Sequence, residues 1–318
     1  MSEHYLLNYV DCTEYKLPLD LQNIFGRKRE TFLEIGFGSG EFILQKAIEN
    51  PNADYLGVEL SMISAKKLLK SISRNHVGNV RALLVDASFA LRNILPKDSM
   101  SGVYMNFPCP WPKKRHSERR LNTVSFIEKI AKVLKKGGFF QLYSDSEEFV
   151  HEMFGEVGKT NCFDDPVLEV NPTVGVGTRY EKKWLDMSKE IFRMKCVRIK
   201  CEINGEEDVV RVSNLWIDDI DEKSLQKVDG KSFSKNEIFV KFMGLYRNMD
   251  RNTFLIETLT VDRDFSQRFY VNLSRRGNRW LIKLDSQARP FRTKAVKFAL
   301  RVLSEKIAKK DPGGDQNH

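Results

Sequence analysis

Three carboxylate side chains lie where successive β-prone segments end. The first of them, Glu34, belongs to residues 31 to 35, which lead into a glycine turn. That turn carries Gly36, Gly38 and Gly40 and precedes a segment with helical character. Glycines let a ligand approach the backbone, and the first amides of a helix can face a polar group. The turn lacks the G-x-G-x-x-G spacing of dinucleotide sites, and a carboxylate beside it would attract an ammonium or sulfonium group. These features predict S-adenosylmethionine (SAM) as the ligand.

The next two β-prone segments also end in acids. Residues 53 to 59 end in Glu59, at the distance from the glycines where a ribose diol is usually held. Residues 80 to 85 are followed by Asp86 and Ala87, where a side chain can accept from an adenine amino group. The carboxyl ends of parallel strands share one edge, so three acids there favour a common site. Each acid taken singly can also cap a helix or solvate a loop.

A proline-rich, cationic loop is the third chemical feature. It runs from Asn106 to His116 with the sequence NFPCPWPKKRH, and Arg119 and Arg120 follow shortly after it. Closely spaced prolines exclude a helix interior and a central strand. The cations are expected to contact the phosphates of a nucleic acid without reading its sequence. The alternative is a solvated basic loop.

Alternating strand and helix patterns continue to about residue 185 and predict an α/β fold, with a parallel Rossmann-like sheet and helices on both faces. An amphipathic helix over residues 126 to 134 ends at a Lys-Lys-Gly-Gly sequence. A buried strand over residues 139 to 144 then delivers Asp145 to the same edge as the other acids. The glycine-punctuated loop of residues 171 to 177 is expected to position Thr178 to Glu181 over the pocket.

The C-terminal part of the chain shows a different pattern. Residues 186 to 318 carry 27 basic and 20 acidic residues, an excess of seven within the net charge of +9. Their β-rich segments and a final helix over residues 291 to 309 predict a smaller α+β domain. Its basic balance suggests a polyanionic partner, whereas surface lysines alone can serve solubility. The cluster Arg275, Arg276 and Arg279 is the favoured phosphate site in this domain.

The chain therefore divides into an N-terminal arm over residues 1 to 29, a catalytic domain over 30 to 185, a basic α+β domain over 186 to 310 and a disordered tail over 311 to 318. Five cysteines without C-x-x-C spacing indicate neither a metal site nor a disulfide framework. No apolar run is long enough to span a bilayer, and no signal peptide is evident, so a cytoplasmic protein is expected. The oligomeric state stays open, with a monomer favoured.

The order of motifs resembles a known family. The segments EIGFGSG, GVEL, VDA, NFPCPWPKKRHSERR, YSDSEEF and TRYE follow one another as in the bacterial tRNA (guanine-N7)-methyltransferases, which are class I SAM-dependent enzymes. The resemblance covers about residues 30 to 185. It implies methyl transfer from SAM to N7 of a tRNA guanosine, in the variable loop.

The resemblance also implies roles for particular residues. SAM would be bound by Glu34, Gly36, Gly38, Gly40, Glu59, Asp86, Ala87, Asn106 and Cys109. The guanosine or its tRNA would be bound by Lys113, Arg115, Asp145, Thr178, Arg179, Tyr180 and Glu181. Cys109 and Asp145 would be central to catalysis.

The chain departs from the family pattern at Cys109, where an aspartate is usual. A thiol is a much weaker acceptor than a carboxylate. Guanine N7 nevertheless carries a free lone pair, so transfer needs alignment and a suitably charged pocket but no general base. We therefore expect methylation to persist. The alternatives are a SAM-fold RNA-binding protein with reduced or no catalysis, and a methyltransferase for another RNA position or a small molecule.

Overall fold

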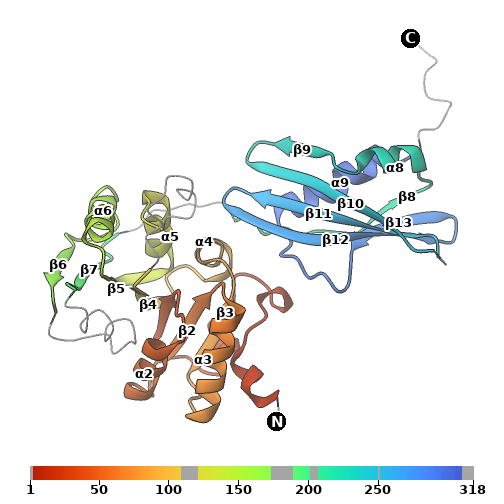
Figure 1. Ribbon diagram of the computed structural model, residues 1–318. Helices are drawn as coiled ribbons and strands as arrows, with labels where there is room; N and C mark the ends of the chain where they lie inside the picture. Colours follow the sequence, from red (N-terminus) through yellow and green to blue (C-terminus); the bar gives the residue numbers. More distant parts are fainter. Residues whose placement is uncertain (1–2, 109–120, 173–188, 201–206, 250, 310–318) are drawn as a thin grey trace. The chain divides into compact units, whose positions relative to one another are not determined.

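The computed structural model describes residues 3–108, 121–172, 189–200, 207–249 and 251–309. The chain forms two compact units, Met1–Gly205 and Glu206–His318. Each unit is built on its own sheet, as Figure 1 shows.

The first unit contains a seven-stranded sheet in the order β3-β2-β1-β4-β5-β7-β6. Its first five members in that order are parallel, whereas β7 runs antiparallel to both β5 and β6. The bounds are β1 (Thr31–Ile35), β2 (Asp54–Glu59), β3 (Val80–Leu84), β4 (Met100–Asn106), β5 (Leu134–Ser144), β6 (Val167–Val170) and β7 (Phe192–Val197). The predicted Rossmann-like sheet is confirmed.

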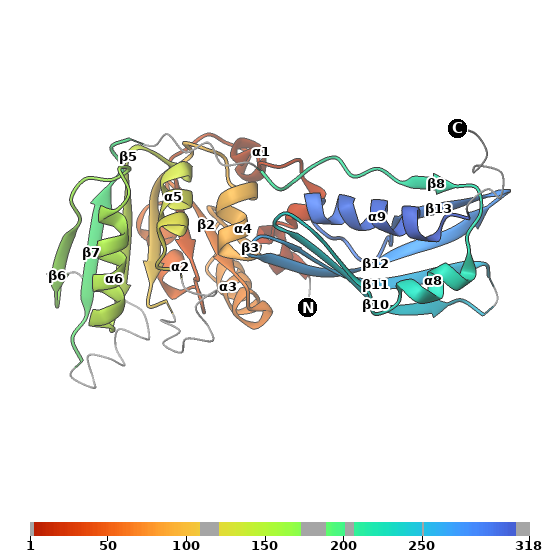
Figure 2. The same ribbon diagram turned by 90° about the horizontal axis from the view of Figure 1, so that it is seen from above.

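Helices cover both faces of this sheet, as predicted. Figure 1 shows α2 and α3 on one side and α4, α5 and α6 on the other. The bounds are α1 (Leu21–Phe25), α2 (Glu41–Glu49), α3 (Met62–Arg74), α4 (Ala87–Phe89), α5 (Val124–Val133) and α6 (Glu147–Gly158). Ser61, Thr123 and Ser146 cap the starts of α3, α5 and α6 with their hydroxyl oxygens. Helices α5 and α6 lie side by side (Figure 2), and the Val124 amide donates to Glu156 across them.

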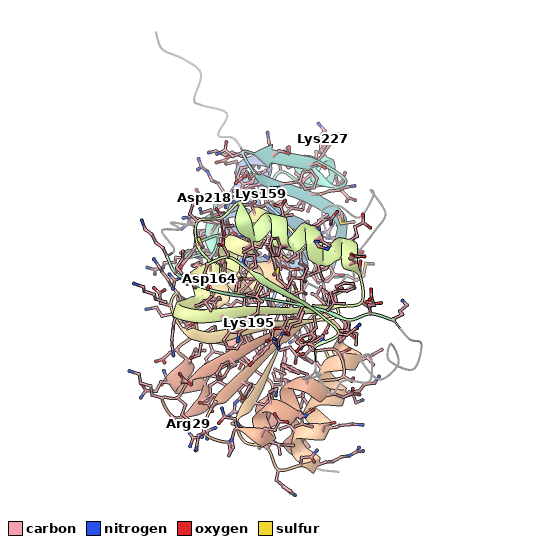
Figure 3. All side chains as sticks on the ribbon, turned by 90° about the vertical axis from the view of Figure 1, so that its left-hand side faces the viewer. Arg29, Lys159, Asp164, Lys195, Asp218 and Lys227 are labelled. Atoms are coloured by element: carbon pink, nitrogen blue, oxygen red, sulfur yellow. The ribbon has the colours of Figure 1, made fainter. Side chains whose placement is uncertain are left out.

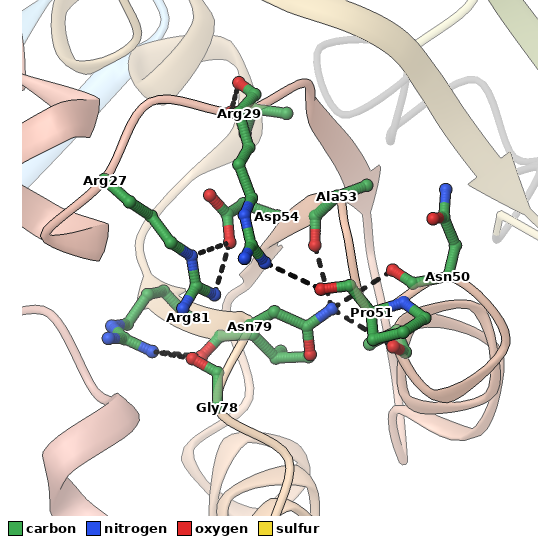
Figure 4. A network of polar contacts seen from close by, with 12 residues as sticks. Arg27, Arg29, Asn50, Pro51, Ala53, Asp54, Gly78, Asn79 and Arg81 are labelled. Atoms are coloured by element: carbon green, nitrogen blue, oxygen red, sulfur yellow. Dashed lines mark hydrogen bonds and ion pairs between the residues drawn. The ribbon is translucent and has the colours of Figure 1, made fainter.

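The amino ends of the strands are held by a polar network (Figure 4). Arg27 donates twice to the buried carboxylate of Asp54 at the start of β2. The side-chain Nδ2 of Asn79, just before β3, donates to the carbonyl oxygens of Ala47, Asn50 and Ala53. These bonds tie the end of α2 to the starts of two strands, at the edge opposite the predicted ligand site.

The boundary predicted after residue 185 is wrong. Strand β7 pairs with β5 from Phe192 to Val197, so it completes the first sheet, and the first unit extends to Gly205. The β-rich pattern of residues 191 to 203 does not reveal which sheet accepts the strand. A second difference concerns β5, which begins at Leu134 and includes the Lys-Lys-Gly-Gly sequence expected to follow the helix as a turn.

The described part of the second unit is an antiparallel sheet with two helices, which confirms the α+β prediction. Its strand order is β8-β13-β12-β11-β10-β9. The bounds are β8 (Leu215–Ile217), α8 (Glu222–Val228), β9 (Ser232–Lys235), β10 (Ile238–Arg247), β11 (Thr253–Asp262), β12 (Phe265–Arg276), β13 (Arg279–Leu284) and α9 (Lys294–Ile307). Alternate strand residues form one core with the apolar faces of α8 and α9. Charged side chains such as Lys159, Lys195 and Lys227 lie at the surface of the two units (Figure 3).

Candidate functional site

The described candidate residues gather at the carboxyl edge of the first sheet. Glu34 lies near the end of β1, and Glu59 and Asn106 are the last residues of β2 and β4. Asp86 directly follows the loop residue after β3, and Asp145 follows β5. Because these five strands are parallel neighbours, their carboxyl ends meet along one edge.

The glycine turn adopts a backbone that only glycine enters readily. Gly36, Gly38 and Gly40 have φ values of +72°, +54° and +80°. A Cβ built at Gly36 or Gly38 would meet no atom within 4 Å, whereas at Gly40 it would lie 2.5 Å from Leu68 Cδ1. The first two glycines therefore leave open space above the backbone, and the third lets α3 pack closely.

Helix α2 begins directly after this turn. Its N-cap is Gly40, which has no side chain to cap the helix. The first amides of the helix therefore lie at the turn with no cap from the N-cap side chain, which suits a polar ligand.

Glu59 fixes the turn against β2. One carboxylate oxygen, Oε2, accepts from the Gly38 amide at 3.0 Å. The other, Oε1, accepts from the amides of Leu60 and Ser61 at 2.8 and 3.0 Å. A carboxylate has about four lone-pair sites, so three donors leave capacity for a ligand hydroxyl.

Glu34 is the buried acid of the site. Glu34 is 3% exposed, and its Oε1 accepts a hydrogen bond from Asn106 Nδ2 at 2.9 Å. Burial raises the pKa of Glu34 to about 7, and the negative charge of Glu59 adds to the rise. The hydrogen bond from Asn106 and the backbone amide of Ile43 both act to lower the pKa of Glu34. The Ile43 amide nevertheless makes no well-aligned hydrogen bond to Oε2.

Two buried acceptors of this pair lack a donor. Glu34 Oε2 and Asn106 Oδ1 have no hydrogen-bond partner among the described residues. A buried acceptor without a partner is costly, so native proteins rarely leave one. Two such atoms on neighbouring strand ends, beside an open glycine turn, match a ligand that brings several N–H donors.

Asp86 and Asp145 make other contacts. Asp86 Oδ1 accepts from the Phe89 amide at 2.8 Å, so this side chain caps α4, as the simpler interpretation of the sequence allows. Ala87 is the first residue of that helix. Asp145 is partly exposed, and its Oδ2 lies 3.4 Å from Lys189 Nζ. Both carboxylates remain at the shared edge.

Phe107 is a residue that sequence reasoning missed. Its φ of +48° places a bulky residue in the left-handed region, which is strained. The Phe107 amide donates to the Tyr143 carbonyl oxygen at 2.8 Å, and its ring packs with Phe42 and Ile191. The following Pro108 signals a restricted backbone but not this conformation. Phe107 thus fixes the backbone that directly follows Asn106, at the carboxyl end of β4.

The remaining candidates lie outside the described residues. These are Cys109, Lys113, Arg115, Thr178, Arg179, Tyr180 and Glu181. Within the described ranges, no cluster of three or more His, Cys, Asp or Glu side chains could hold a metal ion. None of the described helices is both long and apolar enough to cross a membrane.

Known proteins resemble the chain along most of its length. A family model described as "Putative methyltransferase" matches residues 28–194. The tRNA (guanine-N(7)-)-methyltransferase of Thermotoga maritima is 36% identical over 310 residues, which cover 93% of this chain and 97% of that protein. The enzyme of the same name from Aquifex aeolicus is 28% identical and covers 95% of this chain and 100% of its own length. A crystal structure of the 16S rRNA methyltransferase KamB aligns with a TM-score of 0.44 and 14% identity, over 57% of this chain and 92% of that one.

Proposed function

The chain belongs to the tRNA (guanine-N7)-methyltransferase family, and from this premise we propose that it methylates N7 of a guanosine in the variable loop of tRNA. SAM is the methyl donor in this family of enzymes. The relatives carry an enzyme name over nearly the full length of this chain, which favours catalysis over RNA binding alone. The proposal places the protein in the cytoplasm and takes a monomer as the working unit.

The Glu34 and Asn106 pair is the observation that carries the proposal. Oε2 and Oδ1 are buried acceptors without donors, next to a turn whose first two glycines leave open space. An ammonium group has three N–H donors and the charge that the Glu34 carboxylate favours. These residues therefore fit the amino acid end of SAM, and Glu59 has acceptor capacity for its ribose hydroxyls.

Methyl transfer to guanine N7 requires no general acid or base from the protein. When bound, SAM supplies an electrophilic methyl group on a sulfonium. Guanine N7 presents its lone pair on the major-groove edge of the base, so no proton has to leave before transfer. The protein's task is to align the base and to place negative charge nearby. Asp145 directly follows β5, the strand next to β4 and its Asn106, and we assign Asp145 to accept from the N–H groups of the base.

Reaching N7 in a folded tRNA requires the base to leave its stack. Unstacking costs a few kcal/mol, which contacts to the extruded base must offset. We assign this holding role to Asp145 together with Thr178, Arg179, Tyr180 and Glu181. Lys113 and Arg115 are assigned to phosphates, which set affinity and register but not sequence.

The test is product identification. Unmodified tRNA is incubated with the native protein and SAM, digested to nucleosides and analysed by mass spectrometry. N7-methylguanosine is expected, and its position is mapped to the variable loop. A different methylated nucleoside, or none, would overturn the proposal.

The Cys109→Asp variant, assayed in parallel, tests the departure from the family pattern. A carboxylate there is expected to raise turnover while leaving the product unchanged, because it adds a strong acceptor and negative charge beside the reacting centre. Equal turnover of the two proteins would show that Cys109 is a neutral substitution.

A further inference from the structure

The sheet of the second unit has one face that no described helix of that unit covers. Helices α8 and α9 pack on the opposite face, where Phe242, Ile256 and Val271 meet Val296 and Leu303. Strand residues alternate between faces, so the residues between these core positions point the other way. A bulge between Phe242 and Gly244 shifts the alternation in β10 by one residue, so Leu245 packs on the core side and Tyr246 lies on the other. We call that other side the open face.

Three exposed aromatic side chains lie on the open face. Tyr246 on β10, Trp216 on β8 and Tyr270 on β12 are 51%, 46% and 38% exposed. The rings of the two tyrosines form an edge contact with centroids 6.2 Å apart. Large aromatic groups are unusual in exposed clusters, and a cluster of them marks an interaction surface.

Cationic side chains lie beside the aromatic ones on this face. The strand register places Lys241, Leu259 and Arg268 in one row across β10, β11 and β12. A second row contains Tyr246, Leu255, Asn272 and Lys283, across β10 to β13. Each basic group thus lies within two strands of an aromatic ring, a separation of roughly 10 Å.

The charge balance of the open face favours an anionic partner. Among the described strand residues of this face, the acidic one is Glu257. Glu257 Oε1 lies 3.8 Å from Arg268 Nη1, and Oε2 accepts a hydrogen bond from the Tyr246 hydroxyl at 3.5 Å. Lys241 and Lys283 form no ion pair with a described residue, whereas in the arginine-rich hairpin Arg275 and Arg279 pair with Asp219 and Asp218. Two of the three basic residues of the open face thus lack an ion pair among the described residues, whereas two of the three arginines of the hairpin are paired.

We propose that the open face binds an unpaired segment of the tRNA, an inference that rests on the proposed function for the identity of the RNA. Tyr246, Tyr270 and Trp216 stack against bases, and the basic residues Lys241, Arg268 and Lys283 contact phosphates. Aromatic rings on a sheet with neighbouring cations suit splayed single-stranded bases, because every base has a stacking surface. A protein partner fits less well, since the cores of protein interfaces are depleted in lysine.

The experiment uses the full-length protein and fluorescently labelled unmodified tRNA. Binding is followed by fluorescence anisotropy over a range of salt concentrations. The first variant, Tyr246→Leu with Tyr270→Leu, keeps apolar contact with the sheet but removes the rings. The second, Lys241→Gln with Lys283→Gln, removes two charges. A matched control, Lys297→Gln with Arg301→Gln, removes two charges from the exposed side of α9 in the same unit.

The loss of each ring is expected to weaken tRNA binding about five-fold or more. The two lysine substitutions are expected to lower the slope of log affinity against log salt by about 1.4 to 1.8, and the α9 control by much less. SAM affinity, measured by calorimetry, stays unchanged in all three variants. Folding is checked by circular dichroism and thermal unfolding.

Three results would overturn the inference. The first is equal tRNA affinity of the tyrosine variant, the lysine variant and the α9 control. The second is a change of sedimentation coefficient in the open-face variants without loss of RNA binding, which would assign the face to self-association. The third is a lowered unfolding temperature with normal RNA binding, which would assign it to packing within the chain. Failure of the native protein to form N7-methylguanosine, with RNA binding still lost in the variants, would reject the proposed function alone.

Discussion

At the scale of single residues, the site depends on how two carboxylates are satisfied. Glu59 is met by three backbone amides, so its charge is stabilised and the glycine turn is fixed. Glu34 is buried and accepts one side-chain hydrogen bond, from Asn106, so its charge is disfavoured. Glu59 therefore holds the glycine turn in place, and Glu34 remains able to bind a cationic ligand.

Glu34 predicts a pH dependence of SAM binding. Its pKa is about 7 in the free protein, so the carboxyl group is largely neutral below that pH. A cationic ligand favours the ionised form, and SAM affinity should therefore rise as the pH increases from 6 to 7.5. Calorimetric titrations of the native protein and of Glu34→Gln check this. The variant experiences the same titration of the ligand, so a parallel rise in both would contradict the role of Glu34.

The raised pKa of Glu34 also makes the stability of the free protein depend on pH. SAM affinity rises with pH, whereas the stability of the free protein falls. Because the folded-state pKa is raised above the ordinary value of 4.5, the contribution of Glu34 is fully present below pH 4.5 and is lost as the pH rises through about 7. Glu34→Gln should remove this loss. Urea unfolding at pH 5 and pH 8 measures it, and an identical pH dependence of the two proteins would exclude Glu34 as the source.

Glu59→Ala should weaken SAM binding by about 10- to 100-fold, because it removes an acceptor of the ligand and three hydrogen bonds that hold the turn. The tRNA affinity should stay near normal. Glu49→Ala, which removes an exposed carboxylate from α2, is the matched control. Equal loss of SAM and tRNA binding would show that Glu59 supports the whole unit and not the ligand site.

At the scale of elements, the glycine turn links β1, α2 and α3. Gly38 faces open space, whereas Gly40 lies against Leu68 of α3. The same kind of backbone thus serves two purposes, since one glycine leaves room for a ligand and the other permits helix packing.

The two glycines predict different costs for the same substitution. Gly38→Ala should destabilise the protein by about 1–2 kcal/mol, from the left-handed backbone alone. Gly40→Ala should cost roughly 1–3 kcal/mol more, because its Cβ would overlap Leu68. Chemical unfolding of both variants measures the difference, and equal costs would contradict the packing role of Gly40. SAM binding should be weakened by Gly38→Ala as well.

At the scale of the whole molecule, the boundary between the units determines what each part can do. The first unit needs β7, which pairs with β5 along six residue positions. The second unit has its own core, formed by its sheet with α8 and α9. SAM binding is expected to reside in the first unit, and the open face belongs to the second.

Two truncations test this boundary. A chain that ends after Gly205 keeps β7 and should unfold cooperatively and bind SAM. A chain that ends after Leu185 lacks β7, which exposes the edge of β5 and should cause aggregation. Thermal unfolding and size-exclusion chromatography compare the two with the full chain. Equal behaviour of the two truncations would show that β7 is dispensable for the first sheet.

Local patterns predicted the strands, the glycine turn and the acids at the carboxyl edge, because each is encoded in a short stretch of sequence. The bond between Glu34 and Asn106 joins residues 72 positions apart, and no periodicity indicates it. The pairing of β7 with the first sheet and the strained backbone of Phe107 likewise depend on tertiary packing. The open face was missed because its two rows emerge only from strand register.

The central claim is that Glu34 and Asn106 bind a cationic ligand at the carboxyl edge of the first sheet. A crystal structure of the protein with SAM tests it most directly. The account predicts the ligand's amino group within hydrogen-bonding distance of Glu34 Oε2 or Asn106 Oδ1, above Gly36 and Gly38. A ligand bound elsewhere, with both of these oxygens still lacking a donor, would contradict it.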